Sequence, residues 1–411
     1  MFNFQFSILP PDLPRPVRIA AISYLAHLLV QGWIASSEIF LAIALIAAAV
    51  AVWKRQLTIP FHILYFPLFL YALASSISAL VSDRRIHLFA ESALWNKLLI
   101  FPLAVALFVR IPAMRRLALL AFLGFGLFMS AFGLVQYFIL HQRDLEHRIT
   151  GPAPHVMTYS GLLLPISLLF LLFALHKRKP WLFAGAGVTG LSLLLTFTRS
   201  AWVGYGAAVI VLVMMRRTRW LGWAAALALW LVILSPLPIF GRLVSTFDLK
   251  QSSNFDRLRM AQAGVEIIKD YPLFGVGPAN IKEVYPLYRR HDAPRFRIPH
   301  LHNNFLQIWA ESGILALTGY VLLLILFLRE TIRRWMQDRD IMAEAGILVA
   351  ISLTAAGLFE FNFGDTEVLL AMLDLFALVI VSVGAVPPGQ GRDPLARPAT
   401  PVNGTPAPAV A

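Results

Sequence analysis

Long apolar runs alternate with short polar connections along nearly the whole chain. A run of about 20 apolar residues is long enough to cross a membrane as a helix. The pattern therefore predicts an all-α integral membrane protein with about twelve transmembrane helices. The predicted spans are 18–35, 37–53, 60–81, 92–109, 115–140, 156–175, 180–197, 200–215, 219–239, 305–328, 341–361 and 365–386.

One long polar stretch, residues 240–304, interrupts this pattern between the ninth and tenth predicted helices. It divides the chain into a first set of helices at 1–239, a large loop, and a second set of helices at 305–386. Within the loop, residues 256–270 place apolar side chains at helical spacing, which predicts an amphipathic helix resting on the membrane surface. The loop is rich in basic residues: Arg242, Lys250, Arg257, Arg259, Lys269, Lys282, Arg289, Arg290, Arg295 and Arg297.

Composition supports the membrane interpretation and excludes several kinds of chemistry. Of the 411 residues, 58% are hydrophobic and 14% are charged, whereas about a quarter of a soluble domain is charged. The net charge of +13 would suggest nucleic acid in a soluble protein, but here much of it lies in short loops, where it attracts membrane lipid. We therefore expect no nucleic-acid partner. The chain has no cysteine, which excludes disulfides, thiolate metal sites and a cysteine nucleophile.

The distribution of lysine and arginine predicts the orientation in the membrane. Basic residues recur in alternate short loops, at 54–55, 110–116, 177–179, 216–219 and 329–339, and such loops face the cytoplasm. The large loop then lies on the opposite side, which is the periplasm of a Gram-negative bacterium. The segment 387–411 is rich in proline, alanine and glycine and is expected to be a disordered cytoplasmic tail.

Four arginines on the side of the large loop are candidate ligand-binding residues. Arg199 separates two apolar spans; it could snorkel to the interface, but a charge near membrane depth indicates a functional site by default. Arg257 and Arg259 lie at the start of a predicted helix, where they oppose the macrodipole unless an anionic partner is present. Arg148, in an earlier outer loop, is either solvated or part of the same site.

Two histidines mark the point where the polar loop meets the next apolar helix. His300 and His302 precede Asn303 and Asn304. A His-x-His pair can chelate zinc, but no acidic third ligand stands at helical spacing, so no metal is expected. Imidazole titrates near neutrality and suits proton transfer. His302 is therefore a candidate general base, with His300 and Asn303 in supporting positions.

Together these residues predict a site for a phosphorylated or diphosphorylated lipid. Arginine grips phosphate with two parallel hydrogen bonds, and a neutral histidine beside it could accept a proton from an attacking hydroxyl. The sequence has no glycine-rich phosphate loop and no aspartate pair for a nucleotide with Mg²⁺, so no cofactor is expected. A lipid diphosphate leaving group would drive the reaction instead.

Four segments resemble motifs of the O-antigen ligase and polymerase superfamily. They are residues 196–200 (TFTRS), residues 257–258 (RL) followed by 270–277 (DYPLFGVG), His302-Asn303 with Gly313 ten residues later, and residues 148–151 (RITG). The chain departs from the family pattern at Ala316, where glycine is common, and at Ala261, where tryptophan is common. We expect both departures to affect packing rather than chemistry.

The overall similarity is greatest to the ligases of this superfamily. It implies a GT-C-like fold in the bacterial inner membrane and transfer of O-antigen polysaccharide from undecaprenyl diphosphate to a sugar of lipid A–core. It also implies an inverting reaction on the periplasmic side without metal or ATP. By this resemblance His302 is the general base, and Arg199 and Arg257 bind the diphosphate, with Arg148 and Arg259 as further candidates.

Three other functions remain open from the sequence. An O-antigen polymerase or a protein O-oligosaccharyltransferase would use the same donor with a different acceptor. A flippase or transporter for a lipid-linked sugar would need charges spread inside the spans and interrupted helices in both halves.

Overall fold

The computed structural model describes residues 9–82, 94–142, 144, 146–217 and 251–384. Within these ranges all regular secondary structure is helical. The helices are α1 (Arg15–Leu29), α2 (Ile34–Trp53), α3 (Tyr65–Val81), α5 (Ile100–Arg110), α6 (Ala113–Phe138), α7 (Val156–Lys177), α8 (Pro180–Leu195), α9 (Arg199–Arg216), α12 (Ser252–Asp270), α13 (Ile281–Tyr288), α14 (Asn304–Asp338), α15 (Ile341–Ala356) and α16 (Thr366–Ser382).

The predicted apolar spans coincide with helices wherever the structure describes them. Four helices, α2, α6, α7 and α14, are long and apolar enough to cross a membrane, and α3, α8 and α15 are shorter apolar helices. This confirms an all-helical architecture over the described residues, with the features of an integral membrane protein, while the number twelve stays a prediction. The predicted span 219–239, residues 240–250 of the large loop and the tail 387–411 lie outside the described residues.

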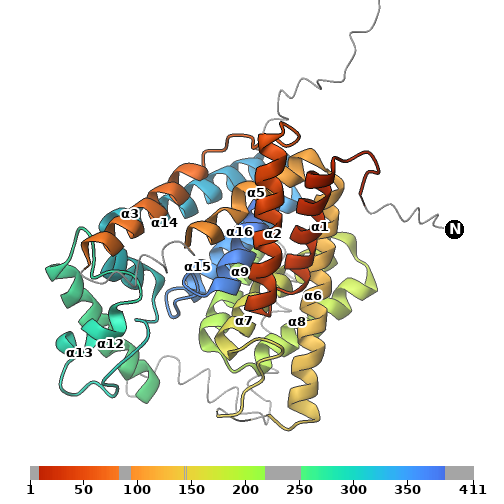
Figure 1. Ribbon diagram of the computed structural model, residues 1–411. Helices are drawn as coiled ribbons and strands as arrows, with labels where there is room; N and C mark the ends of the chain where they lie inside the picture. The colour runs from red at the N-terminus through yellow and green to blue at the C-terminus, as the bar shows by residue number, and fades with distance from the viewer. Residues whose placement is uncertain (1–8, 83–93, 143, 145, 218–250, 385–411) are drawn as a thin grey trace, which may run out of the picture.

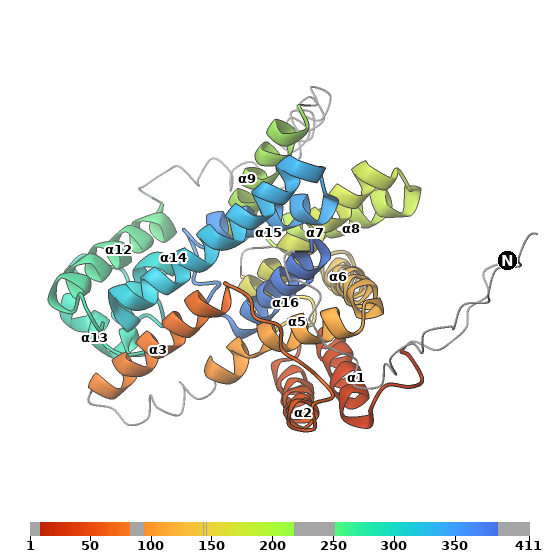
Figure 2. The ribbon, with the colours of Figure 1, turned by 90° about the horizontal axis from the view of Figure 1, so that it is seen from above.

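The helices form a bundle with a smaller lobe at one end. Figure 1 shows α12 and α13 together at that end, and Figure 2 shows α3 and α14 running side by side toward them. At the other end, α1 and α2 pack against each other as a hairpin. The core of the bundle is formed by α7 and α16, which are buried along most of their length.

One acidic residue is fully buried in this apolar core. Asp374 of α16 accepts hydrogen bonds from the Tyr24 hydroxyl at 2.8 Å and from Gln31 Nε2 at 2.9 Å, and His27 Nε2 lies 3.3 Å away. A carboxyl group at membrane depth is costly unless it is paired. These three partners offset that cost and tie the first helix of the bundle to the last.

The lobe is joined to the bundle through a break in α14. Gly313 has φ 78° and ψ 179°, a conformation that interrupts the helix. The turn 272–277 inserts into the break through three backbone hydrogen bonds. These bonds run from Val276 N to Ala310 O at 2.9 Å, from Gly277 N to Glu311 O at 2.9 Å, and from Ile314 N to Pro272 O at 3.1 Å.

Glycine is required on both sides of this interlock. A Cβ on Gly313 would lie 1.9 Å from the carbonyl oxygen of Leu273, and a Cβ on Gly275 would lie 2.4 Å from that of Glu311. Neither neighbour is a flexible side chain that could move aside. On the other flank, the Ser78 hydroxyl of α3 donates to Glu311 O at 2.7 Å. The interlock fixes α12, which leads into the turn, relative to the start of α14.

Candidate functional site

The structure brings most of the predicted site residues to two adjoining cavities. A polar cavity of about 160 Å³ is lined by Arg148, Met157, Phe197, Thr198, Arg199, Ser200, Ser253, Asp256, Arg257, Arg295 and His302. An apolar cavity of about 260 Å³ is lined by Arg199, Ser200, Val203, Asn254, Arg257, Leu258, Ala261, Leu301, His302, Asn303, Leu306, Leu358 and Phe359. Arg199, Arg257 and His302 line both, so residues from α9, α12 and the start of α14 meet at the junction.

Arg259 is the predicted arginine that lies apart. It lines neither of these two cavities. Its guanidinium pairs with Asp292, donates to Gln262 Oε1 at 2.7 Å, and lies over the ring of Phe255. These contacts give Arg259 a position within the lobe rather than at the junction.

Arg199 is held at the first turn of α9 by the start of α12. Its side chain donates to Gln251 Oε1 and to the Ser253 hydroxyl, both at 2.6 Å. The residue is 6% exposed, and the nearby Phe197 adopts a left-handed φ of 53°. A planar guanidinium can make both contacts with its two terminal nitrogens. Arg199 is therefore a buried, oriented cation rather than a snorkelling one.

His302 lies in a strained turn just before α14. Its φ is 52°, a left-handed value that is uncommon outside glycine and that clusters at functional sites. The next residue, Asn303, caps α14, because its side chain accepts a hydrogen bond from Leu306 N at 3.0 Å. The Nδ2 group of Asn303 also donates to Leu358 O at 3.0 Å. These contacts give Asn303 a structural role as the cap of α14, and its role at the site stays a prediction.

Asn304 clamps the loop 357–365, which connects α15 to α16, against the start of α14. Its backbone N–H donates to Gly357 O at 2.7 Å. Its side chain donates to Asn362 Oδ1 at 2.6 Å and accepts from Phe363 N at 3.1 Å. These bonds bring a distant part of the sequence beside His302.

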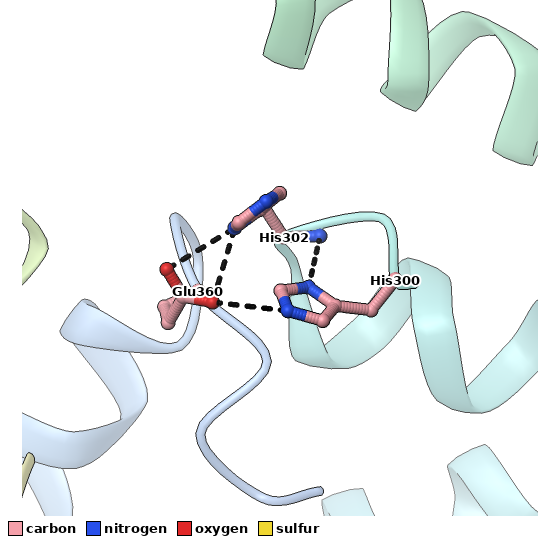
Figure 3. Close-up of side chains that lie close together, drawn as sticks. All are labelled: His300, His302 and Glu360. Carbon is pink, nitrogen blue, oxygen red and sulfur yellow. Dashed lines mark hydrogen bonds and ion pairs between the residues drawn. The ribbon is translucent and has the colours of Figure 1, made fainter. Parts of the chain in front are cut away.

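Glu360 is the carboxylate that this loop delivers to His302 (Figure 3). His302 Nδ1 lies 3.0 Å from Oε1 and 3.1 Å from Oε2 of Glu360. His300 Nε2 lies 3.7 Å from Oε1, and a terminal nitrogen of Arg257 lies 3.7 Å from Oε2. Sequence reasoning missed Glu360. An acidic residue at the outer end of an apolar run was the available signal, but the predicted span ran to 361, whereas α15 ends at Ala356.

The electrostatics of this cluster favour an ionised Glu360 beside a neutral His300. Burial alone would raise the pKa of Glu360, but the hydrogen bond from His302 and the electrostatic effect of the neighbouring His302, His300 and Arg257 outweigh it and lower the pKa. Burial, followed by the electrostatic effect of the neighbouring His302, lowers the pKa of His300 to about 4. Burial is also the largest cause of a lowered pKa at Arg257, which marks a partly desolvated guanidinium.

The contact with Glu360 selects one tautomer of His302. A carboxylate accepts only, so Nδ1 carries a proton, and in the neutral ring Nε2 keeps its lone pair. Among the residues that the structure describes, Nε2 has no hydrogen-bond partner. The ring therefore offers an available proton acceptor where the two cavities meet.

The same three residues form a possible metal site. The ligand atoms of His300, His302 and Glu360 all lie within 4.8 Å of one another, and two imidazoles with one carboxylate suit zinc. The expectation of no metal rested on the lack of a third ligand, and the fold supplies one from a distant segment. Arg257, 3.7 Å from Glu360, opposes the binding of a divalent cation.

Comparison with protein families finds a match for part of the chain. Residues 184–321 match the family model described as O-antigen ligase. This match confirms the resemblance to the O-antigen ligase and polymerase superfamily. It supports glycosyl transfer of the ligase or polymerase type, with lipid-linked polysaccharide substrates, at the inner membrane. The search of curated proteins found no match. Arg199, Arg257 and His302 lie inside the matched segment, whereas Arg148 and Glu360 lie outside it.

Proposed function

We propose that this protein is an O-antigen ligase of the O-antigen ligase and polymerase superfamily. It transfers O-antigen polysaccharide from undecaprenyl diphosphate to a sugar hydroxyl of lipid A–core on the periplasmic side, with inversion and without metal or ATP. The observation that carries the proposal is the meeting of a buried arginine, a partly buried arginine and one oriented histidine at the junction of a polar and an apolar cavity. The donor has the matching chemistry, because its charged headgroup joins a sugar to an apolar chain.

His302 serves as the general base in this proposal. Its Nε2 takes the proton of the acceptor hydroxyl as that oxygen attacks the anomeric carbon. Glu360, at 3.0 Å from Nδ1, keeps the ring in the required tautomer and stabilises the imidazolium that forms. This is the same division of labour as in hydrolase triads, in which a carboxylate orients the histidine.

The arginines serve the leaving group. Arg199 and Arg257 stabilise the negative charge that grows on the diphosphate as the glycosidic bond breaks, and Arg148 supports them from the wall of the polar cavity. Burial strengthens these interactions because the local dielectric is low. No nucleotide is needed, since the diphosphate itself is the leaving group.

The apolar cavity receives the first part of the lipid chain. Leu258, Leu306 and Phe359 are among its lining residues. On α12, Leu258 and Val265 are exposed, which supports a membrane-facing surface for this helix. The predicted amphipathic face is corrected in one respect, because Ile268 is buried in the lobe.

A purified transfer assay tests the proposal. The full chain in detergent, given undecaprenyl-diphosphate-linked polysaccharide and lipid A–core, should produce lipopolysaccharide, and His302→Ala should abolish transfer while the protein remains folded. Absence of transfer by the wild-type chain to any acceptor would overturn the proposal.

A deletion strain separates the ligase from the polymerase. Lipid A–core that lacks polymer, while polymer is still built on its carrier, indicates a ligase. Lipid A–core that carries a single repeat indicates a polymerase. Loss of glycan from proteins alone indicates a protein O-oligosaccharyltransferase.

A further inference from the structure

The polar cavity contains one carboxylate that the arginines do not fully satisfy. Asp256 lies in the first turns of α12 and is 4% exposed. Its Oδ2 atom forms an ion pair with Arg295 Nε at 2.8 Å. Its Oδ1 atom is buried and has no hydrogen-bond partner among the residues that the structure describes. Leaving a buried carboxylate oxygen unpaired is costly, so such an atom calls for a donor from outside this part of the chain.

The charge around Asp256 indicates what that donor is. Four arginines line the same cavity: Arg148, Arg199, Arg257 and Arg295. An anion would gain nothing from contact with Oδ1, because like charges repel. The group that meets Oδ1 must instead be neutral and carry a hydrogen, as a sugar hydroxyl or an acetamido N–H does.

We propose that Asp256 Oδ1 accepts a hydrogen bond from the sugar attached directly to the donor diphosphate. This inference rests on the proposed function. The sugar is bonded to the diphosphate, so it lies beside the arginines that hold that group, and Asp256 precedes Arg257 in the same helix and shares its cavity. Through Asp256, the site recognises the donor's first sugar in addition to its diphosphate. The same hydrogen bond helps to orient the anomeric carbon toward His302.

The test compares donor carriers with and without sugar. Binding of undecaprenyl diphosphate and of undecaprenyl diphosphate bearing one sugar is measured on the purified full chain in detergent, for wild type and for Asp256→Asn. In the variant, Arg295 captures the amide oxygen, which leaves an NH₂ group where Oδ1 stood. Affinity for the sugar-bearing carrier should fall about tenfold to hundredfold, the usual worth of a hydrogen bond to a charged group. Affinity for the sugar-free carrier should stay the same.

Two further variants make this comparison decisive. Asp292→Asn is the matched control, because Asp292 also pairs with an arginine of the lobe but does not line the polar cavity; both affinities should stay at the wild-type level. Asp256→Glu keeps the charge and can still pair with Arg295, while it moves the free oxygen, so it should show the same selective loss. It replaces Asp256→Asn if that protein does not fold.

Three outcomes would overturn the inference. Equal weakening of both carriers would mean that Asp256 acts only through Arg295. No change in either affinity would mean that Oδ1 meets only water. A rise in the KM for lipid A–core, with donor affinity unchanged, would assign the contact to the acceptor sugar. Failure to use this donor at all looks different, because wild type would then bind neither carrier. A polymerase would still bind both carriers, and the deletion strain identifies it.

Discussion

The interlock between the lobe and α14 makes Gly313 the position where a single methyl group should do most harm. Gly313→Ala would force alanine into a backbone region populated almost only by glycine, at a cost of about 1 to 3 kcal/mol. The new Cβ would also lie 1.9 Å from the Leu273 carbonyl oxygen. Because that neighbour is backbone, the turn 272–277 must move away.

The movement would break the three hydrogen bonds of the interlock, at 2.9, 2.9 and 3.1 Å. Each contributes about 0.5 to 1.5 kcal/mol net, so the local loss amounts to about 3 to 7 kcal/mol. The apolar helices do not depend on these bonds. We therefore expect the lobe to detach locally, with Arg257 displaced from His302, while the bundle stays folded.

Hydrogen exchange and transfer activity together report this change. In Gly313→Ala, exchange of the amides of Val276, Gly277 and Ile314 should accelerate about 100-fold or more, and transfer should be lost, while far-ultraviolet circular dichroism stays unchanged. Gly124→Ala is the control, since Gly124 lies within α6 and a Cβ there would have no described atom of another element within 4 Å; alanine at this position should be neutral or slightly stabilising. Wild-type exchange and activity in Gly313→Ala would refute the reasoning.

Four further predictions concern the site. Arg199→Lys should lower transfer tenfold or more, because an ammonium cannot keep the fork geometry of a guanidinium; full complementation by lysine would show that charge alone suffices. Glu360→Gln should lower kcat about 10²-fold to 10⁴-fold with little change in the donor KM. A wild-type kcat in this variant would show that Glu360 does not assist His302 as general base. The pKa of His300 is about 4 in the folded chain against about 6.5 unfolded, so the unfolded state binds more protons between these values. His300 therefore contributes roughly 3 kcal/mol to the free energy of unfolding above pH 6.5, and this contribution is lost as the pH falls toward 4. In His300→Gln, the melting temperature should change less between pH 4 and 6.5 than it does in wild type. The same pH dependence in both proteins would show that His300 is not its cause. Added zinc should inhibit transfer by binding His302 Nδ1, His300 and Glu360, whereas a chelator alone should not; loss of activity in chelator, restored by zinc, would replace the metal-free mechanism.

The helices were predictable because their signal is local. A run of apolar residues fixes where a span lies, and every predicted span that the structure describes contains a helix. The ends were less certain. Helix α14 continues to Asp338 rather than 328 because Glu330 pairs with Arg333 and Arg334 one turn later, and such pairs extend a helix beyond its apolar part.

The candidate site was predictable where a residue's type and its place in the chain sufficed. Charged or titratable groups at the edge of apolar spans are costly to place there, so they indicate a functional site. This criterion selects Arg148, Arg199, Arg257 and His302. Their lining of a common cavity agrees with that interpretation. Arg259 has the same sequence signature as Arg257, but its side chain pairs with Asp292 instead of lining the cavity. No pattern along the chain predicts which of the two arginines lines the cavity.

Contacts between distant segments could not be predicted in this way. Glu360 reaches His302 only because Asn304 clamps the loop 357–365, and the break at Gly313 exists only because the turn 272–277 inserts there. Each depends on two parts of the chain meeting in space. A single sequence shows the residues but not the pairing.

The loop that carries Glu360 lies outside the segment of the chain that matches the family model. The family signature ends at residue 321, yet the carboxylate beside the imidazole belongs to the hairpin that follows it. A transplant of the signature segment alone would move the histidine without its acidic neighbour. If the proposed role of Glu360 holds, the hairpin α15–α16 has to accompany the matched segment whenever such chains are recombined or shortened.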